Sequence, residues 1–246
     1  MSGLTGKAAL VTGGSRGIGA AIARQLAADG ADVAVTYVSN PAGAQATVDA
    51  IKALGRRAFA VQADAADASA VTAAVEKTAA EFGRFDILVN NAGIYETKPI
   101  ENFSIADFDR MVAVNVRAAF AATKAAVSHM KDGGRIISIG SGLAERMPFA
   151  GVAVYSMTKA AIAALMQGLA RELGPRGITV NTVHPGSIDT DMNPGDGPYA
   201  DFQRSLSAVG RHGKAEEIAA AVAYLASPGA AFVTGTALKV DGGFCA

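Results

Sequence analysis

Three residues in the middle of the chain, Ser141, Tyr155 and Lys159, have side chains suited to proton transfer. Tyr155 and Lys159 stand four apart at the start of an alanine-rich helical pattern, so both side chains leave the same helix face. Ser141 follows the apolar run 135–139, which is typical of a buried strand. We expect the lysine ammonium to favour the phenolate and to lower the tyrosine pKa from about 10. Tyr155 could then exchange a proton with a carbonyl or alcohol oxygen that Ser141 also hydrogen-bonds.

A Tyr-x-x-x-Lys pair also occurs by chance on solvated helix faces, but the N-terminal region gives this one a context. The apolar run 7–11 leads into a glycine-rich turn, and a helical pattern follows, as a dinucleotide-binding loop requires. Gly13 would permit the tight turn, and Gly17 and Gly19 would let the backbone and the helix approach a pyrophosphate at the helix N-terminus. The predicted cofactor contacts of this loop are Gly13, Ser15, Arg16, Gly17, Ile18 and Gly19.

The end of the second strand indicates which dinucleotide is bound. A site that prefers NAD places an Asp or Glu there to bind the ribose 2′-hydroxyl. Here the strand ends at Tyr37, followed by Val38 and Ser39, without a carboxylate. Arg16 could hold a 2′-phosphate instead. The sequence therefore favours NADP(H), with Tyr37 and Ser39 among its contacts. The alternative is that Arg16 is solvated and both cofactors are accepted.

The composition excludes several other classes of protein. Half of the 246 residues are apolar and the formal net charge is zero, which suits a soluble chain with a large core. The sequence has no basic tract for nucleic acid, no signal sequence and no apolar run long enough for a membrane. Cys245 is the single cysteine and the three histidines are scattered, so neither a disulfide framework nor a metal site is expected. We expect a cytoplasmic protein with one domain, 1–246.

Strand and helix patterns alternate along the chain, which predicts parallel strands joined by helical crossovers. The expected strands are 8–11, 33–38, 57–61, 86–90, 135–139, 178–183 and 237–240; the expected helices are 18–29, 42–54, 68–82, 104–130, 153–173 and 215–226. This is an α/β fold of Rossmann type, a doubly wound parallel sheet of about seven strands with helices on both faces. The irregular segment 186–213, with a short helix near 198–207, is predicted to be a substrate lid.

Further motifs extend the pattern over nearly the whole chain. They are Asn90-Asn91-Ala92-Gly93 after the fourth strand, Asn115 on the long helix, Pro185-Gly186-x-x-x-Thr190 after the sixth strand and Val240-Asp241-Gly242-Gly243 near the end. With the glycine loop and the Tyr155/Lys159 pair, the chain resembles a classical short-chain dehydrogenase/reductase. The resemblance implies a catalytic tetrad of Asn115, Ser141, Tyr155 and Lys159, with the nicotinamide over the C-terminal edge of the sheet.

The resemblance also implies how the remaining residues act. Asn115 would hold a water on Lys159 and extend the proton path; the alternative is an ordinary helix-kink amide. Asp64 would accept from the adenine amino group, with Ala65 beside it. Ile188 and Thr190 would meet the nicotinamide amide and the phosphates. The other implied cofactor contacts are Asn91, Ala92, Gly93, Tyr155, Lys159, Pro185 and Gly186, whereas Asn90 and Asp241 are interpreted as structural.

Ser141 departs from the family pattern. It stands fourteen positions before Tyr155, one more than the commonest spacing, and Gly142 occupies the commoner position. Glycine has no side-chain donor, so either the loop bulges and Ser141 still reaches the site, or the donor is lost. We expect Ser141 to reach the site.

The function favoured by these features is an NADPH-dependent carbonyl reductase, which in reverse is an alcohol dehydrogenase. A specific form is a 3-oxoacyl carrier-protein reductase, for which Arg146, Arg176 and Arg211 are the candidate docking residues. The alternative from a different class is a regulatory protein that binds a cyclic dinucleotide, because the loop Glu-Arg-Met-Pro at 145–148 resembles that of a few family members proposed to bind such nucleotides. An intact proton relay argues against a pure binding protein.

The residues expected around the substrate are mostly apolar and favour small or medium apolar ketones. They are Tyr95, Gly142, Leu143, Met147, Val152, Gly186, Met192 and Tyr199, with Glu145 and His184 as polar candidates, although His184 is expected to pack at a strand end. Apolar residues on several faces of the helices 104–130 and 153–173 predict pairing across two-fold axes. Together with the tail 232–246, they indicate a homotetramer.

Overall fold

A parallel sheet in the order β3-β2-β1-β4-β5-β6-β9 forms the centre of the computed structural model, which describes residues 3–246. Its strands are β1 (Ala8–Val11), β2 (Asp32–Tyr37), β3 (Ala58–Gln62), β4 (Phe85–Asn90), β5 (Met130–Ile139), β6 (Thr179–Pro185) and β9 (Ala237–Val240). The predicted doubly wound sheet of about seven strands is confirmed. The strand order reverses between β1 and β4, which creates a crevice outside the carboxyl ends of the strands.

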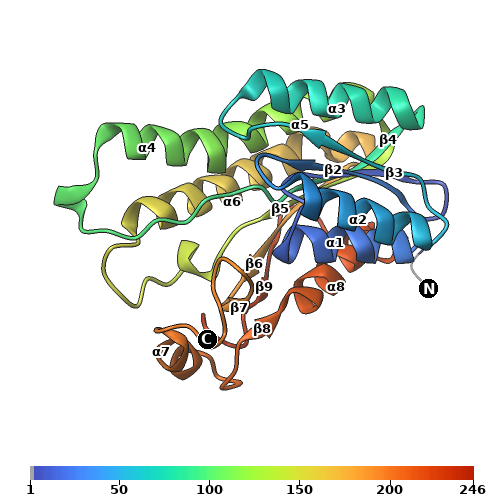
Figure 1. The fold of residues 1–246 in the computed structure, drawn as a ribbon. Helices are drawn as coiled ribbons and strands as arrows, with labels where there is room; N and C mark the ends of the chain where they lie inside the picture. Colours follow the sequence, from blue (N-terminus) through green and yellow to red (C-terminus); the bar gives the residue numbers. More distant parts are fainter. Residues whose placement is uncertain (1–2) are drawn as a thin grey trace.

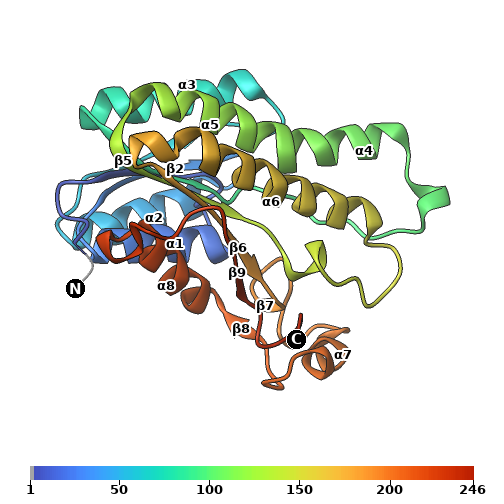
Figure 2. The same ribbon diagram turned by 180° about the vertical axis from the view of Figure 1, so that it is seen from behind.

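Helices cover both faces of the sheet (Figures 1 and 2). One layer contains α1 (Gly17–Ala28), α2 (Pro41–Ala53) and α8 (Ala215–Ala226), and the other contains α3 (Ala68–Phe82), α5 (Ala118–His129) and α6 (Ala153–Leu173). The predicted helices 68–82, 153–173 and 215–226 coincide with α3, α6 and α8. Among the helices of residues 3–246, none combines the length and the apolar composition needed to cross a membrane.

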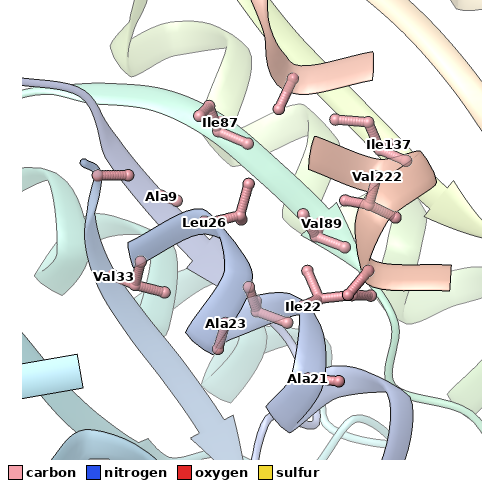
Figure 3. Close-up of a cluster of buried hydrophobic side chains, with 14 of the residues drawn as sticks. Ala9, Ala21, Ile22, Ala23, Leu26, Val33, Ile87, Val89, Ile137 and Val222 are labelled. Carbon is pink, nitrogen blue, oxygen red and sulfur yellow. The ribbon is translucent and has the colours of Figure 1, made fainter. Parts of the chain in front are cut away.

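The core between α1, α8 and the sheet explains why the central strands are continuous apolar runs in the sequence. Ile22 and Leu26 of α1 and Val222 of α8 are fully buried against Val89 and Ile137 of the sheet (Figure 3). A second cluster fills the opposite face, under α3, α5 and α6. Strands covered on both faces have no polar side to expose, so their sequences do not alternate between apolar and polar residues. The two clusters hold the carboxyl ends of the strands in place.

The predicted helix 104–130 is wrong in one respect. The structure divides it into α4 (Ile105–Val112), a π-helical turn (Ala113–Arg117) and α5, and β5 begins at Met130. Asn115 lies in the π-helical turn and is buried. One extra residue in the turn rotates the side chains that follow, and such turns often occur at functional sites. Hydrophobic periodicity could not reveal it, because apolar residues continue through the turn.

The segment 186–213, which is predicted to be a substrate lid and keeps the name lid only as that prediction, is attached at both ends. Strand β7 (Ile188–Asp189) pairs in parallel with β8 (Gly213–Lys214), and the helix α7 (Ala200–Leu206) lies between them. The short helix predicted near 198–207 is therefore confirmed. Both views place α7 beside the C-terminus of the chain, away from the two helical layers (Figures 1 and 2).

Candidate active site

A cleft of about 650 Å³ runs along the carboxyl ends of the strands, from the glycine loop to the lid. Apart from Asn115, the residues predicted for the site line it: Gly13, Ser15, Arg16, Gly17, Ile18, Gly19, Tyr37, Ser39, Asp64, Ala65, Asn91, Ala92, Gly93, Ser141, Tyr155, Lys159, Pro185, Gly186, Ile188 and Thr190. Residues from widely separated segments are thus brought to one wall. Their individual roles stay predictions.

The glycines of the loop act in two ways. Gly13 has a φ of 68° and Gly17 a φ of 53°, which side-chain-bearing residues rarely adopt. Gly19 has an ordinary φ, but a Cβ atom there would stand 2.3 Å from the carbonyl oxygen of Gly13. Gly19 is therefore needed for packing of helix α1 against its own loop. The sequence interpretation had assigned it to the approach of the pyrophosphate.

Thr12 and Asn91 fix this loop to the neighbouring strand end. The Thr12 hydroxyl accepts from the backbone N–H groups of Asn91 and Ala92 at 2.9 and 3.0 Å. The Asn91 side chain donates in return to the carbonyls of Thr12 and Gly13 at 2.8 and 3.1 Å. Thr12 precedes Gly13 directly, and its role as the centre of these contacts is not predicted by the residue spacing of the loop. Asn90 donates to Ser138 at 3.2 Å, which joins β4 to β5 as expected.

Ser141, Tyr155 and Lys159 line the same cleft as the glycine loop. Tyr155 is in the first turn of α6 and Ser141 directly follows β5, and both line the cleft. This placement is the one that the first alternative requires, in which Ser141 still reaches the site despite its spacing; its role there stays a prediction. Lys159 is buried; its Nζ donates to the carbonyl of Ile139 at 2.9 Å and lies 5.7 Å from the centre of the Tyr155 ring. The strand end therefore orients the cation beneath the phenol.

The expected downward shift of the tyrosine pKa is wrong. Burial raises the pKa of Tyr155 to about 12, and the polar side chain of Ser141 nearby opposes this rise without cancelling it. The edge of the Tyr95 ring lies against Tyr155, with the ring centres 4.8 Å apart. Burial also lowers the pKa of Lys159 to about 8. Removal from water is the largest influence on the pKa of either group, so Tyr155 keeps its proton at neutral pH.

Asn115 lies behind the cleft rather than in its wall. Its side chain accepts from the N–H of Ile94 at 2.8 Å and donates to the Ile94 carbonyl and to Thr158 at 3.0 and 3.1 Å. The amide therefore holds the loop after β4, as a kink amide would. A cavity of about 20 Å³ between Asn115 and Lys159 is also large enough for one water molecule. Both interpretations of Asn115 fit this position.

Five of the eight expected substrate-pocket residues line the cleft, namely Tyr95, Gly142, Leu143, Gly186 and Met192. Met147, Val152 and Tyr199 do not line it, because Met147 and Tyr199 are mostly exposed and Val152 is buried elsewhere. Among the cleft residues that the sequence analysis does not predict are Phe149, Leu206 and Phe244. Phe149 meets Phe202 of α7 edge-on, with the ring centres 5.9 Å apart. The spacing of Phe202 and Leu206 on one helix face could have indicated the lid side of this pocket.

The polar candidates Glu145 and His184 lie outside the cleft wall. His184 is buried at the end of β6, and burial lowers its pKa, which favours a neutral ring. Its Nδ1 stands 3.4 Å from a carboxylate oxygen of Glu145, which also pairs with Lys239 at 2.6 Å. His184 packs at the strand end as expected. Asp241 likewise forms a turn, because its carboxylate accepts from the N–H groups of Gly243 and Cys245.

The fold and this site together define a dinucleotide-binding oxidoreductase, and comparison with known proteins gives the family. The family model described as "Enoyl-(Acyl carrier protein) reductase" matches residues 13–245. A short chain dehydrogenase from Burkholderia cenocepacia, solved in complex with NADP, is 56% identical, has a TM-score of 0.98 and covers 99% of this chain and 100% of its own.

Two curated relatives have different names. A "Cyclic-di-GMP-binding biofilm dispersal mediator protein" of Escherichia coli is 47% identical over 246 residues, 99% of either chain. A 3-oxoacyl-(acyl-carrier-protein) reductase of Synechocystis is 41% identical over 246 residues, 99% of this chain and 98% of its own. The chain belongs to the classical short-chain dehydrogenase/reductase family.

Proposed function

We propose that this protein is an NADPH-dependent carbonyl reductase, which reduces a ketone to a secondary alcohol and catalyses the reverse oxidation. The observation that carries this proposal is the meeting of Ser141, Tyr155 and Lys159 on one wall of the cleft that the glycine loop also lines. A proton donor, a second hydrogen-bond donor and a cation beside a dinucleotide loop are the groups needed to reduce a carbonyl.

The residues of the glycine loop suit NADP(H). Helix α1 begins without a side-chain cap and without an acidic residue in its first turn, so its N–H groups and its dipole can receive a pyrophosphate. Arg16, Tyr37 and Ser39 line the cleft at the end of β2 and would surround the 2′-phosphate. The NADP in the relative from Burkholderia cenocepacia supports the same choice. When bound, the cofactor supplies the hydride.

The protein's own residues then handle the carbonyl oxygen. Ser141 donates a hydrogen bond to it, and Tyr155 transfers its phenolic proton to it as the carbon is reduced, leaving an alcohol and a phenolate. The ammonium of Lys159, held by the Ile139 carbonyl, stabilises that phenolate. Because the pKa of Tyr155 is raised to about 12, the proton is in place at neutral pH. In the oxidation direction the same shift disfavours the phenolate base.

The lining of the pocket supports an apolar ketone as the substrate. Tyr95, Phe149 and Phe244 contribute aromatic surface, and Leu143 and Leu206 contribute aliphatic surface. An acyl group attached to an acidic carrier protein would need free basic residues at the entrance.

The three candidate docking residues are occupied within the chain. Arg146 bonds the carbonyl of Phe244, Arg176 bonds the carbonyl of Met130, and Arg211 pairs with Glu217. These contacts favour a free ketone over the carrier-bound substrate named for the Synechocystis relative.

The deciding experiment measures NADPH oxidation across aliphatic, cyclic and aryl ketones, with an acyl-carrier 3-oxoacyl substrate in parallel. We expect turnover of free apolar ketones, and lower kcat/KM on the carrier-bound substrate. Titration with cyclic di-GMP by calorimetry, with and without NADPH, tests the regulatory alternative. Tight binding of that nucleotide together with no turnover of any ketone would favour the binding protein.

We also propose a homotetramer. Two separate groups of exposed apolar side chains support it: Phe108 and Phe120 on α4 and α5, and Tyr224 and Phe232 on α8 and the segment after it. Two apolar faces on one monomer are what two different two-fold interfaces require. Light scattering at micromolar concentration should give four times the monomer mass, and a monomer would contradict the proposal.

A further inference from the structure

The last residues of the chain fold back onto the site. Phe244 is only 6% exposed, and its side chain lines the same cleft as Ser141 and Tyr155. The C-terminus lies beside α7 in both views (Figures 1 and 2). A buried aromatic ring this close to the end of a chain requires contacts that hold it, because chain ends otherwise fray.

A tight turn aims the ring inward. The two oxygens of the Asp241 carboxylate accept from the N–H groups of Gly243 and Cys245, both at 2.9 Å. Gly242 and Gly243 have φ values of 62° and 79°, which a side chain would strain. The backbone therefore reverses directly before Phe244. This turn explains the Asp-Gly-Gly sequence without a role in the chemistry.

The ring of Phe244 occupies the space beside Gly142. A Cβ atom on Gly142 would stand 2.9 Å from a ring carbon of Phe244, closer than such atoms approach. Arg146 donates to the Phe244 carbonyl, and its guanidinium lies over the ring, 5.4 Å from the centre. The thiol of Cys245 donates to the Gly142 carbonyl at 3.4 Å. The tail thus holds the loop that starts at Ser141.

The same tail also contacts the lid. The hydroxyl of Ser207 and the N–H of Val209 both donate to the carbonyl of Gly242 at 3.1 Å. A Cβ atom on Gly243 would stand 2.6 Å from the Cβ of Ala208. The residues just after α7 are therefore packed against the turn that presents Phe244.

We infer that Phe244 is a positioning residue for Ser141 and a wall that limits substrate size, because its ring fills the space that a side chain at position 142 would need. This inference rests on the proposed carbonyl reduction. It accounts for the unusual spacing of Ser141: the tail fixes the longer loop so that Ser141, rather than residue 142, faces Tyr155. Gly142 and Phe244 should then behave as a matched pair.

The test is a double-mutant cycle with Gly142→Ala, Phe244→Ala and the combined variant. Each single change should lower kcat for a small ketone by about 10–100-fold, the effect of a misplaced catalytic group. The combined variant should be no worse than Phe244→Ala alone, since the added methyl then has room. Phe244→Ala should also shift kcat/KM toward bulkier ketones, and NADPH affinity should stay within about twofold. Phe244→Tyr should restore most of the activity.

Thermal unfolding of the same variants gives a readout that does not depend on turnover. Gly142→Ala should lower Tm in the normal chain and have less effect in the Phe244→Ala background. Leu54→Ala is the control, because it removes a half-exposed apolar side chain at the end of α2, outside the cleft and outside the two groups proposed as interfaces. Should Phe244→Ala fold poorly, Phe244→Leu gives the same comparison.

Two results would overturn the inference: unchanged kcat and substrate preference in folded Phe244→Ala, or strictly additive effects in the cycle. If the unaltered protein reduces no ketone, the proposed function fails and the positioning role fails with it. If the Tm values of the four proteins in the cycle were still non-additive in that case, the packing of Phe244 against Gly142 would be the only part of the inference that remains.

Discussion

The two halves of the cleft are held together in different ways. On the glycine-loop side, Thr12 and Asn91 bond backbone groups at the ends of adjacent strands, and Gly19 packs against Gly13. On the substrate side, the lid and the C-terminal tail meet through contacts between segments far apart in the sequence, such as Ser207 with Gly242. The glycine-loop half of the cleft is therefore part of the edge of the sheet. The substrate half is formed by the lid and the C-terminal tail, which pack over that edge.

The residues proposed to transfer the proton and the residues that line the substrate pocket therefore come from parts of the molecule that are held in different ways. Tyr155 and Lys159 stand on α6, which packs directly on β6 and the core, so their geometry depends on the sheet. The pocket residues Phe149, Leu206 and Phe244 come from a loop, the lid and the tail. Changes in those segments should alter the substrate preference, and at Phe244 also the placement of Ser141, while Tyr155 and Lys159 stay in place. Changes on the sheet side should abolish turnover of every substrate.

The largest effect is expected for Tyr155→Phe. The substitution keeps the ring and removes the proton, so kcat for every ketone should fall by about 10²–10⁴-fold, the usual contribution of general acid catalysis. NADPH affinity should be unchanged in fluorescence titrations. Tyr95→Phe is the matched control, since Tyr95 lines the same cleft and contacts Tyr155 edge-on. Retained ketone reduction in Tyr155→Phe would overturn the catalytic assignment.

Ser141→Ala should give the next largest loss. Removal of one donor to the developing oxyanion typically lowers kcat by about 10²–10³-fold. Ser187→Ala removes a hydroxyl from the same cleft on the lid side and should have little effect. A nearly silent Ser141→Ala in steady-state kinetics would mean that the second donor comes from another residue.

Arg16→Ala should act on one cofactor only. A cation bonded to a 2′-phosphate contributes about 1.5–3 kcal/mol, so kcat/KM for NADPH should fall by about 10–100-fold while that for NADH changes little. Arg24→Ala, on an exposed position of α1, is the control. Equal losses with NADPH and NADH would place Arg16 at the pyrophosphate instead of the 2′-phosphate.

Lys159 connects the chemistry to stability. Its folded pKa of about 8 lies below the ordinary value of 10.5, so between these pH values the unfolded chain holds a proton that the folded chain lacks. The contribution of Lys159 to the free energy of unfolding is therefore least favourable below pH 8, and it becomes more favourable as the pH rises from about 8 to about 10.5. Lys159→Met removes the buried charge, and its Tm at pH 7 should be higher by about 2–4 °C for each kcal/mol recovered.

Thermal unfolding at two pH values tests this sign. The advantage of Lys159→Met over the unaltered protein should shrink as the pH rises toward about 10. Lys124→Met, at an exposed position of α5, should show no such change. An advantage that grows with pH would mean that Lys159 is stabilised as a cation in the folded protein.

The two halves of the cleft also differ in how far the sequence predicts them. The strands and the helices α3, α6 and α8 follow from local apolar periodicity, and the glycine loop follows from residue spacing at a strand end. Phe244 could not be found this way, because its burial depends on contacts with residues about a hundred positions away.

The tyrosine pKa was predicted in the wrong direction for a related reason. Residue spacing indicates that Lys159 stands near Tyr155, but not how much water either side chain loses. Burial is a property of the whole fold, and here it is the largest influence on both pKa values. The sequence pattern likewise predicts that Asn115 lies on a helix, but it does not reveal the π-helical turn that sets the direction of the Asn115 side chain.

The smallest expected effect concerns the contact that joins the two halves directly. Arg16 of the glycine loop lies 3.8 Å from Asp191 of the lid, and both side chains are more than half exposed. Such a pair contributes about 0.2–1 kcal/mol. If Arg16 must leave Asp191 to bind a 2′-phosphate, Asp191→Asn should tighten NADPH binding by about two- to fivefold and leave NADH binding unchanged. Fluorescence titration of both cofactors measures this.

Asp191→Asn also distinguishes two explanations for tighter NADPH binding. One is that Asp191 and the 2′-phosphate compete for Arg16, and the other is a general change in the charge of the lid. Asp196→Asn alters another exposed lid carboxylate and should not change either affinity. In the Arg16→Ala background, Asp191→Asn should give no further gain, because the competing cation is absent. A gain that persists there would arise from the lid's negative charge acting on the cofactor phosphates at a distance. In that case the two halves interact through their electrostatic field rather than through one ion pair.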